Sequence, residues 1–265
     1  MSALAVAVDR DVIEVRGPDA RSYLHSQLSQ DVTAIAVGES RWSFLLQPTG
    51  KVEALLRITC TGDDVFVLDT DGGHAEHVVA RLNRFKIRVK ADITVLDWNA
   101  LVVFAEMPPP SIVVDALVVP LGWPGVEGVV VMGTEVPVAN GTLEDYEQRR
   151  VEAGWPAMGA ELTDATIPGE TGLTGVAVSF TKGCYPGQEL VERIDSRGGN
   201  VARHLRRLRV HGGAALETGS SLAHDGKEVG RVTSVAGSAA LGYVGRAVDP
   251  PAVLDAGGVS VEVLG

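Results

Sequence analysis

Short apolar runs separated by turn residues constrain the fold of this chain more than any other sequence feature. Residues 42–47 and 52–60 are two such runs, and they are separated by Pro48-Thr49-Gly50-Lys51. Proline and glycine in a short segment between apolar runs are turn signals, so this stretch predicts a β-hairpin. A second turn at 61–64 leads into another apolar run at 65–68. Successive strands in this part of the chain are therefore expected to pair antiparallel.

Three helices are predicted in the first 154 residues. The first follows Gly17-Pro18, because proline suits the first turn of a helix, where its missing N–H costs least. The second covers 74–85, where apolar residues recur with helical spacing. The third starts after Thr142, an N-cap with the acidic Asp145 three positions on, and it stops at Gly154.

Strands fill most of the remaining sequence. Residues 4–16 predict one strand and residues 89–104 another, with a break near Asn99. Pro108-Pro109-Pro110 suits neither a central strand nor a helix interior, so it marks an insertion tip or a boundary between lobes. Beyond Arg197, short strands with frequent glycine predict a small barrel or sandwich. Antiparallel strands with helices grouped apart from them favour an α+β fold over a doubly wound sheet.

The overall charge argues against a general nucleic-acid binder. The chain has 265 residues, with 34 acidic and 23 basic side chains and a net charge of −11. Such binders are usually basic, so a polyanion would have to be met by a local patch. Two cysteines, Cys60 and Cys184, cannot build a disulfide framework or a four-cysteine metal site. With no signal peptide and no apolar run of membrane-spanning length, we expect a cytoplasmic protein without membrane partners.

The segment richest in chemistry is Lys182-Gly183-Cys184-Tyr185-Pro186-Gly187-Gln188-Glu189. If it begins extended, Lys182 and Cys184 lie on one face, and Pro186-Gly187 suits the first turn of a helix. A thiol between an ammonium and a helix N-terminus would have its thiolate stabilised. The alternative is a buried, inert cysteine beside a tight turn, and spacing alone favours neither.

This eight-residue segment resembles the signature of the YgfZ-type folate-binding proteins, which are relatives of the glycine-cleavage T-protein. Residues 100–140 show little of the resemblance, but other parts of the chain share it. They are Gly17-Pro18-Asp19-Ala20 with 24–32, Leu46-Gln47-Pro48-Thr49-Gly50-Lys51, Arg150-Val151-Glu152-Ala153-Gly154, Pro168-Gly169-Glu170-Thr171-Gly172-Leu173 and Val229-Gly230-Arg231-Val232-Thr233-Ser234.

The resemblance implies an α+β, GcvT-like fold with three lobes around a central opening. Residues 1–100 would form an N-terminal α+β folate-binding lobe, interleaved with the next. Residues 101–197 would form a middle α+β lobe that carries the signature, and residues 198–265 a small C-terminal β-barrel.

The resemblance also implies a site for tetrahydrofolate or a one-carbon derivative. In the T-protein, the Glu of an Arg-x-Glu-Ala-Gly motif pairs with the pterin ring, and here it falls on Glu152. A carboxylate can accept two parallel hydrogen bonds from the pterin amino group and a ring N–H. The alternative is that Glu152 is simply exposed or paired with Arg149 or Arg150. The implied functional pair is Cys184 with Lys182. Further expected folate contacts are Tyr185, Gln188, Glu189 and Arg193.

The T-protein's catalytic aspartate has no counterpart in this sequence. The T-protein carries it in a Gly-Gly-x-x-Asp-Asp segment after the hairpin turn, and that Asp-Asp aligns with Ala54-Leu55. Glu53 is adjacent, but in a strand a shift of one residue points to the opposite face. Folate binding is therefore expected, whereas true aminomethyltransferase activity is not.

Two basic clusters stand out against the acidic composition. They have two interpretations: solvated faces neutralised by nearby acids, or an anion site for a folate glutamate tail, a tRNA or a partner protein. One holds Arg81, Arg84, Lys86, Arg88 and Lys90, and the other Arg193, Arg197, Arg203, Arg206, Arg207 and Arg209.

The histidines indicate no metal site. His74 and His77 have metal-like spacing on a helix, but two imidazoles are an incomplete ligand set, so surface histidines are the better interpretation. The other four lack ligand spacing and receive no role: His25, His204, His211 and His224.

Three functional hypotheses follow. The leading one is a tetrahydrofolate-binding accessory protein that supports iron–sulfur enzymes, including those that modify tRNA, through a functional cysteine. The second is a folate-dependent aminomethyltransferase-like one-carbon enzyme. The third is a tRNA- or partner-binding module with a vestigial folate pocket.

Overall fold

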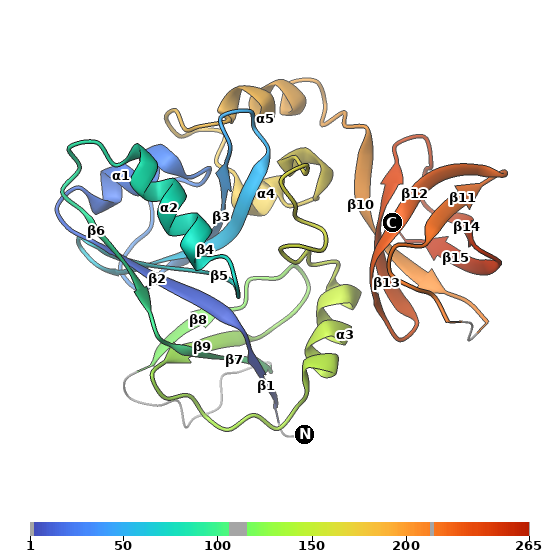
Figure 1. The fold of residues 1–265 in the computed structure, drawn as a ribbon, viewed down its shortest axis with the longest axis horizontal. Coiled ribbons are helices and arrows are strands. Elements are labelled where there is room, and N and C mark those ends of the chain that lie inside the picture. The colour runs from blue at the N-terminus through green and yellow to red at the C-terminus, as the bar shows by residue number, and fades with distance from the viewer. Residues whose placement is uncertain (1–2, 106–115, 213–214, 265) are drawn as a thin grey trace.

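The chain forms two antiparallel sheets and a closed six-stranded barrel, joined by helices and a long irregular segment (Figure 1). The computed structural model describes residues 3–105, 116–212 and 215–264. Within them, all pairings between named strands are antiparallel. The predicted α+β class is confirmed. The Pro108-Pro109-Pro110 segment, predicted to be a tip or boundary, lies outside the described residues.

The five-stranded sheet contains the predicted hairpin. Its strands, in spatial order, are β3 (Ser40–Leu46), β4 (Val52–Gly62), β5 (Val65–Asp71), β2 (Arg10–Arg16) and β6 (Asp92–Leu96). The helices α1 (Ala20–Gln27) and α2 (Ala75–Phe85) cover one face. Successive side chains of β2 point to opposite faces of the sheet and so belong to two different hydrophobic cores. Ile13 packs in one core with Leu24 and Val78 of these helices. The adjacent Val12 belongs to the core on the opposite face.

The four-stranded sheet covers that opposite face. Its strands, in spatial order, are β1 (Leu4–Val8), β7 (Asn99–Phe104), β9 (Val129–Gly133) and β8 (Leu117–Pro120). Residues 4–16 were predicted to be one strand, and this is wrong: the chain breaks at Asp9, and β1 and β2 enter different sheets. The predicted break near Asn99 is confirmed, since β6 ends at Leu96 and β7 starts at Asn99.

The helix α3 (Leu143–Ala153) stands between the sheets and the barrel. The predicted N-cap is confirmed: Asp145 N–H donates to the Thr142 hydroxyl, and the Asp145 carboxylate accepts from Thr142 N–H. Gly154 ends the helix with a φ of 74°.

A barrel or a sandwich was expected after Arg197, and the structure shows a closed barrel. Its strands, in spatial order, are β10 (Arg203–Val210), β13 (Ala239–Gly245), β12 (Lys227–Ala236), β11 (Ser221–His224), β14 (Ala252–Ala256) and β15 (Val259–Val263).

The segment between α3 and the barrel carries the signature. It contains the short helices η1 (Pro168–Glu170) and α4 (Thr174–Ala177), followed by α5 (Gln188–Asp195). Pro186 and Gly187 were predicted in the first turn of this last helix, but they form a turn before it. Gly187 is the N-cap with a φ of 84°, which is outside the helical region, so α5 begins one residue later.

In the described part of the chain, no helix is long and apolar enough to span a membrane.

Candidate functional site

The signature is held against the turn of the β3–β4 hairpin by a close glycine contact. A Cβ atom on Gly187 would lie 2.6 Å from Gln47 O and 2.9 Å from Gly50 Cα. Gly50 is equally confined, because its Cβ would lie 2.6 Å from Leu190 Cβ. Both glycines also have positive φ values, 84° and 85°. Two sequence motifs far apart in the chain therefore form one packed unit, in which neither glycine tolerates a side chain.

Lys182 fastens the other end of the signature to α1. Its ammonium donates hydrogen bonds to the carbonyl of His25 and, at 2.6 Å, to that of Leu28. Both carbonyls belong to the C-terminal end of α1, where helix carbonyls lack partners and a cation is favoured. Lys182 Nζ also lies 4.8 Å from the centroid of the Tyr185 ring. Burial lowers the pKa of Lys182 to about 8.

Cys184 is exposed, so the alternative of a buried cysteine is wrong. Lys182 lies two residues before it in the chain. Cys60, by contrast, is buried, and its Sγ lies 3.2 Å from the Arg21 guanidinium. The structure thus presents one thiol to solvent and shields the other.

The remaining signature residues lie around the start of α5. Tyr185 is buried, burial raises its pKa to about 12, and its hydroxyl has no hydrogen-bond partner among the described residues. Gln188 accepts from Tyr185 N–H at 3.3 Å and donates to Glu192 at 2.5 Å. Glu189 and Arg193 are exposed on α5. The role of these residues in binding folate stays a prediction.

Two residues beside the signature were missed by the sequence analysis. His25 Nδ1, near the end of α1, lies 3.2 Å from Asp31 Oδ1 in the following loop. Burial, reinforced by the Lys182 ammonium, lowers the pKa of His25. Hydrogen bonds, the strongest from the Thr33 hydroxyl, lower the pKa of Asp31. Nothing in their spacing gave a signal, because the contact depends on how the chain turns after α1.

Glu152, the predicted pterin partner, is exposed on α3. One of its carboxylate oxygens accepts a hydrogen bond from Gln148 at 2.5 Å. Arg150 does not pair with it, because that guanidinium binds Glu147 at 2.7 Å and the buried Glu161 at 3.0 Å. The Glu152 carboxylate is therefore accessible, and its acceptor chemistry fits the donor edge of a pterin.

The site residues occupy two places in the fold. Cys184 and Lys182 lie before α5, and Lys182 contacts the end of α1, whereas Glu152 lies on α3 beside the barrel (Figure 1). Among the described residues, no hydrogen bond or ion pair joins Glu152 to the segment 182–189. The structure brings the signature residues together and places the predicted pterin partner on a separate element.

The sequence has no carboxylate at the position that aligns with the T-protein's catalytic aspartate, and the structure places no unpaired carboxylate of a neighbouring described residue there. Ala54 and Leu55 are buried, and Glu53 forms an ion pair with Arg81 at 2.8 Å. On the neighbouring strand Asp71 is partly exposed, and its carboxylate is already bound by other groups.

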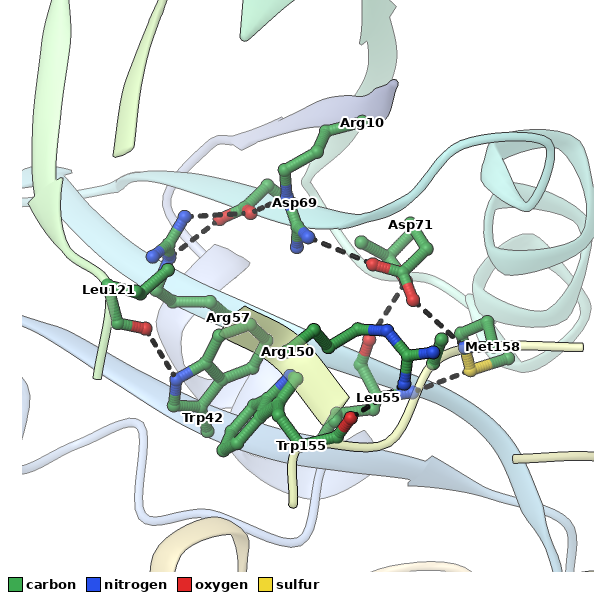
Figure 2. A network of polar contacts seen from close by, with 12 residues as sticks. Arg10, Trp42, Leu55, Arg57, Asp69, Asp71, Leu121, Arg150, Trp155 and Met158 are labelled. Atoms are coloured by element: carbon green, nitrogen blue, oxygen red, sulfur yellow. Dashed lines mark hydrogen bonds and ion pairs between the residues drawn. The ribbon is translucent and has the colours of Figure 1, made fainter. Parts of the chain in front are cut away.

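That carboxylate belongs to a buried charge network that the sequence analysis also missed (Figure 2). Asp69 accepts two hydrogen bonds from Arg57, both at 2.9 Å, and one from Arg10 at 2.6 Å. Arg10 also bonds Asp71 at 3.0 Å, and Met158 N–H donates to the same carboxylate at 2.9 Å. Burial alone would raise the pKa of Asp69, but Arg57 and Arg10 hold it below its usual value. The network connects the sheet to the segment after α3.

Some members of the two basic clusters have structural roles. Arg81 is buried against Glu53, so it does not belong to a solvated face. In the second cluster, Arg203 pairs with Glu170 and Arg209 with Glu262. Within the described residues, no group of three or more His, Cys, Asp or Glu side chains could hold a metal ion.

Comparisons with known proteins agree with this architecture. The family model for the GCVT N-terminal domain matches residues 10–105. A "tRNA-modifying protein YgfZ" from Cronobacter sakazakii is 26% identical over 78% of this chain and 71% of its own length. An iron–sulfur cluster assembly factor homolog from the mitochondria of Chaetomium globosum is 26% identical over 74% of this chain. The chain spans only 54% of the length of that relative.

A solved structure shows that the fold extends over the whole chain. The aminomethyltransferase of the glycine cleavage system from Bartonella henselae superposes with a TM-score of 0.85 and 20% identity, covering 99% of this chain and 85% of its own. At that identity the likeness concerns the fold. Several YgfZ proteins are similar to most of the length of this chain and the GCVT model matches its five-stranded sheet, so the chain resembles the GcvT-like proteins of the YgfZ type.

Proposed function

We propose that this protein is a tetrahydrofolate-binding accessory factor that supports iron–sulfur enzymes and tRNA modification through Cys184. The observation that carries the proposal is the exposed thiol on a segment fastened at both ends, by Lys182 and by Gly187. A structural cysteine needs no such exposure, whereas a thiol that meets a partner does. The two processes come from the names of the relatives, a tRNA-modifying protein and an iron–sulfur cluster assembly factor.

The folate part of the proposal rests on Glu152. Its exposed carboxylate would accept hydrogen bonds from the pterin amino group and ring N–H. Tetrahydrofolate would supply a carrier for one-carbon units. The further proposed contacts are Tyr185, Gln188 and Glu189 of the signature and Arg193 of α5.

The structure supports an accessory role over aminomethyl transfer. Apolar, buried Ala54 and Leu55 occupy the position where the T-protein carries its aspartate, and neighbouring Glu53 is paired with Arg81. A carboxylate that positions an amine substrate is therefore missing from that position.

Calorimetric titration with tetrahydrofolate tests the binding site. We expect saturable binding that weakens by about 1.5–3 kcal/mol in Glu152→Ala, the range for hydrogen bonds to a charged group. Glu144→Ala is the matched control, because Glu144 is also exposed on α3 but lies in its first turn. Equal affinities of wild type and Glu152→Ala would exclude Glu152 as the pterin partner, and no binding by wild type would remove folate from the proposal.

Reconstitution tests the accessory role. Wild-type protein should speed activation of an apo iron–sulfur enzyme that modifies tRNA, in the presence of a cluster donor, and Cys184→Ser should not. Cys60→Ser is the control, since Cys60 is the shielded thiol. Full activity of Cys184→Ser would show that the thiol is dispensable.

A further inference from the structure

Basic and apolar residues alternate from Arg84 to Lys90, at the end of α2 and in the turn after it, and these residues are called the 84–90 surface. Ile87 is 78% exposed, and Phe85, the last residue of α2, is 37% exposed. Neither side chain belongs to the hydrophobic core under α2. Single exposed apolar side chains are common on proteins, but two large ones at one turn form a patch of the kind that marks interaction sites.

The Phe85 ring is held in place by a buried guanidinium. Arg81 Cζ lies 4.1 Å from the centroid of this ring. Arg81 is itself fixed by an ion pair with Glu53 at 2.8 Å and by a hydrogen bond to Leu46 O at 3.0 Å. An aromatic ring that is already fixed loses little conformational freedom when a partner covers it, so Phe85 has the properties of an interface anchor.

Four cations surround the two apolar side chains: Arg84, Lys86, Arg88 and Lys90. Among the described residues, none of the four forms an ion pair. The Asp19 carboxylate accepts a hydrogen bond from the backbone N–H of Lys90 at 2.7 Å. Arg88 has a φ of 59°, which is uncommon for a residue other than glycine. The 84–90 surface is therefore an apolar centre with a ring of cations that lack side-chain counter-charges in the described structure.

The 84–90 surface and the signature are attached to the same end of α1. Arg81, which supports the Phe85 ring, donates a hydrogen bond to Gln27 Oε1 at 3.3 Å. Lys182 donates to the carbonyl of Leu28, the next residue after Gln27, at 2.6 Å. The exposed Cys184 follows Lys182 by two residues. A large partner bound to the 84–90 surface would therefore lie on the side of the protein that presents the exposed thiol.

We propose that the 84–90 surface docks a protein that presents apolar side chains ringed by carboxylates, and that this protein is the iron–sulfur enzyme served by Cys184. The inference rests on the proposed accessory role and names the surface through which the partner is held. A protein fits better than tRNA, because burial of Ile87 is favourable against apolar side chains and not against phosphates. The net charge of −11 also repels a long polyanion, whereas a ring of carboxylates needs only local cations.

Fluorescence anisotropy with the labelled apo iron–sulfur enzyme of the reconstitution assay tests this surface, without a cluster donor or folate. We expect Ile87→Asp to raise the Kd by about tenfold or more, because it places a charge in the apolar centre. Arg84→Glu/Arg88→Glu should act in the same direction, because it reverses two of the cations.

Each variant has a matched control. Val138→Asp introduces the same charge at an apolar residue that is 93% exposed and precedes α3. Arg149→Glu/Lys227→Glu reverses two exposed cations on α3 and the barrel. Both controls should bind the apo enzyme like wild type. Thermal denaturation checks the folding of every variant, and the charge reversal at exposed Arg84 and Arg88 keeps the test available should Ile87→Asp not fold.

Three outcomes overturn the proposal. They are no binding of the apo enzyme by wild type, equal Kd values for the 84–90 variants and their controls, and binding of labelled tRNA alone that Arg84→Glu/Arg88→Glu abolishes. The last outcome would make the 84–90 surface a polyanion site. Cys184→Ser should bind the apo enzyme like wild type. A failed reconstitution with intact binding that depends on Ile87 would therefore reject the role of the thiol and leave the docking surface standing.

Discussion

Lys182 Nζ lies 2.6 Å from the carbonyl oxygen of Leu28, the residue that follows the last turn of α1. The signature is therefore bound to a helix end by a half-buried cation. Desolvation of this cation lowers the pKa of Lys182 to about 8.

This lowered pKa makes stability depend on pH above neutrality. The unfolded chain keeps the Lys182 proton up to its ordinary pKa of 10.5, whereas the folded protein releases it near 8. Between these values the unfolded state binds more protons, so the contribution of Lys182 to the free energy of unfolding rises with pH. Urea denaturation at several pH values should show this rise in wild type and not in Lys182→Met. Lys51→Met, at an exposed lysine of the hairpin turn, should keep it. A constant difference between Lys182→Met and wild type at every pH would contradict the prediction.

Gly187→Ala should separate the signature from the hairpin turn. The new methyl group would lie 2.6 Å from Gln47 O at a φ of 84°, so we expect a loss of more than about 1 kcal/mol in the free energy of unfolding. Gly175→Ala is the control, because its Cβ would meet nothing within 4 Å and it lies in α4. That change should stabilise the protein by about 0.5–1 kcal/mol. Equal stability of the two variants would show that the turn adapts.

Asp69→Asn should be strongly destabilising. It removes the negative charge shared by Arg57 and Arg10, and the side chains of both Arg57 and Asp69 are fully buried. Breaking a buried ion pair on one side costs about 3–5 kcal/mol. Glu14→Gln, which breaks an exposed ion pair with Arg16, should cost less than about 1 kcal/mol. The double variant Arg57→Met/Asp69→Leu should lose less than Asp69→Asn, as measured by chemical denaturation; a larger loss would refute the argument.

Tyr185→Phe should leave stability unchanged or raise it by up to about 1 kcal/mol. The hydroxyl is buried without a partner among the described residues, and removing an unsatisfied polar group relieves its desolvation cost. Thermal denaturation measures the effect, with Tyr243→Phe as the control, because that hydroxyl donates to Glu161 O at 3.0 Å and its loss should destabilise. A clear loss of stability in Tyr185→Phe would mean that the hydroxyl has a partner in solution.

The local parts of this fold were predictable from sequence. The β3–β4 hairpin follows from its turn residues, and the start and end of α3 follow from Thr142, Asp145 and Gly154. Each of these signals acts within a few residues, where sequence spacing fixes geometry.

Contacts between distant segments were not predictable. Arg57 and Asp69 lie opposite each other only because β4 and β5 pair in one register. A one-residue shift of either strand would send its own charge to the other face of the sheet, away from its partner. Lys182 meets the end of α1 only because the segment before α5 lies against it. The separation of β1 from β2 was missed for the same reason, since the apolar pattern of 4–16 does not reveal which sheet each half joins.

The pairing of β1 with β7 sets an order of assembly. Leu4 lies opposite Phe104, so the two strands are made at well-separated times during synthesis. The five-stranded sheet is complete in sequence at Leu96, before β7 has emerged from the ribosome. Because Asp9 alone separates β1 from β2, the early strand is tethered to a sheet whose strands all precede β7 in the chain. β7 therefore finds its neighbour held in place, and a contact that is distant in sequence becomes a local encounter for the growing chain.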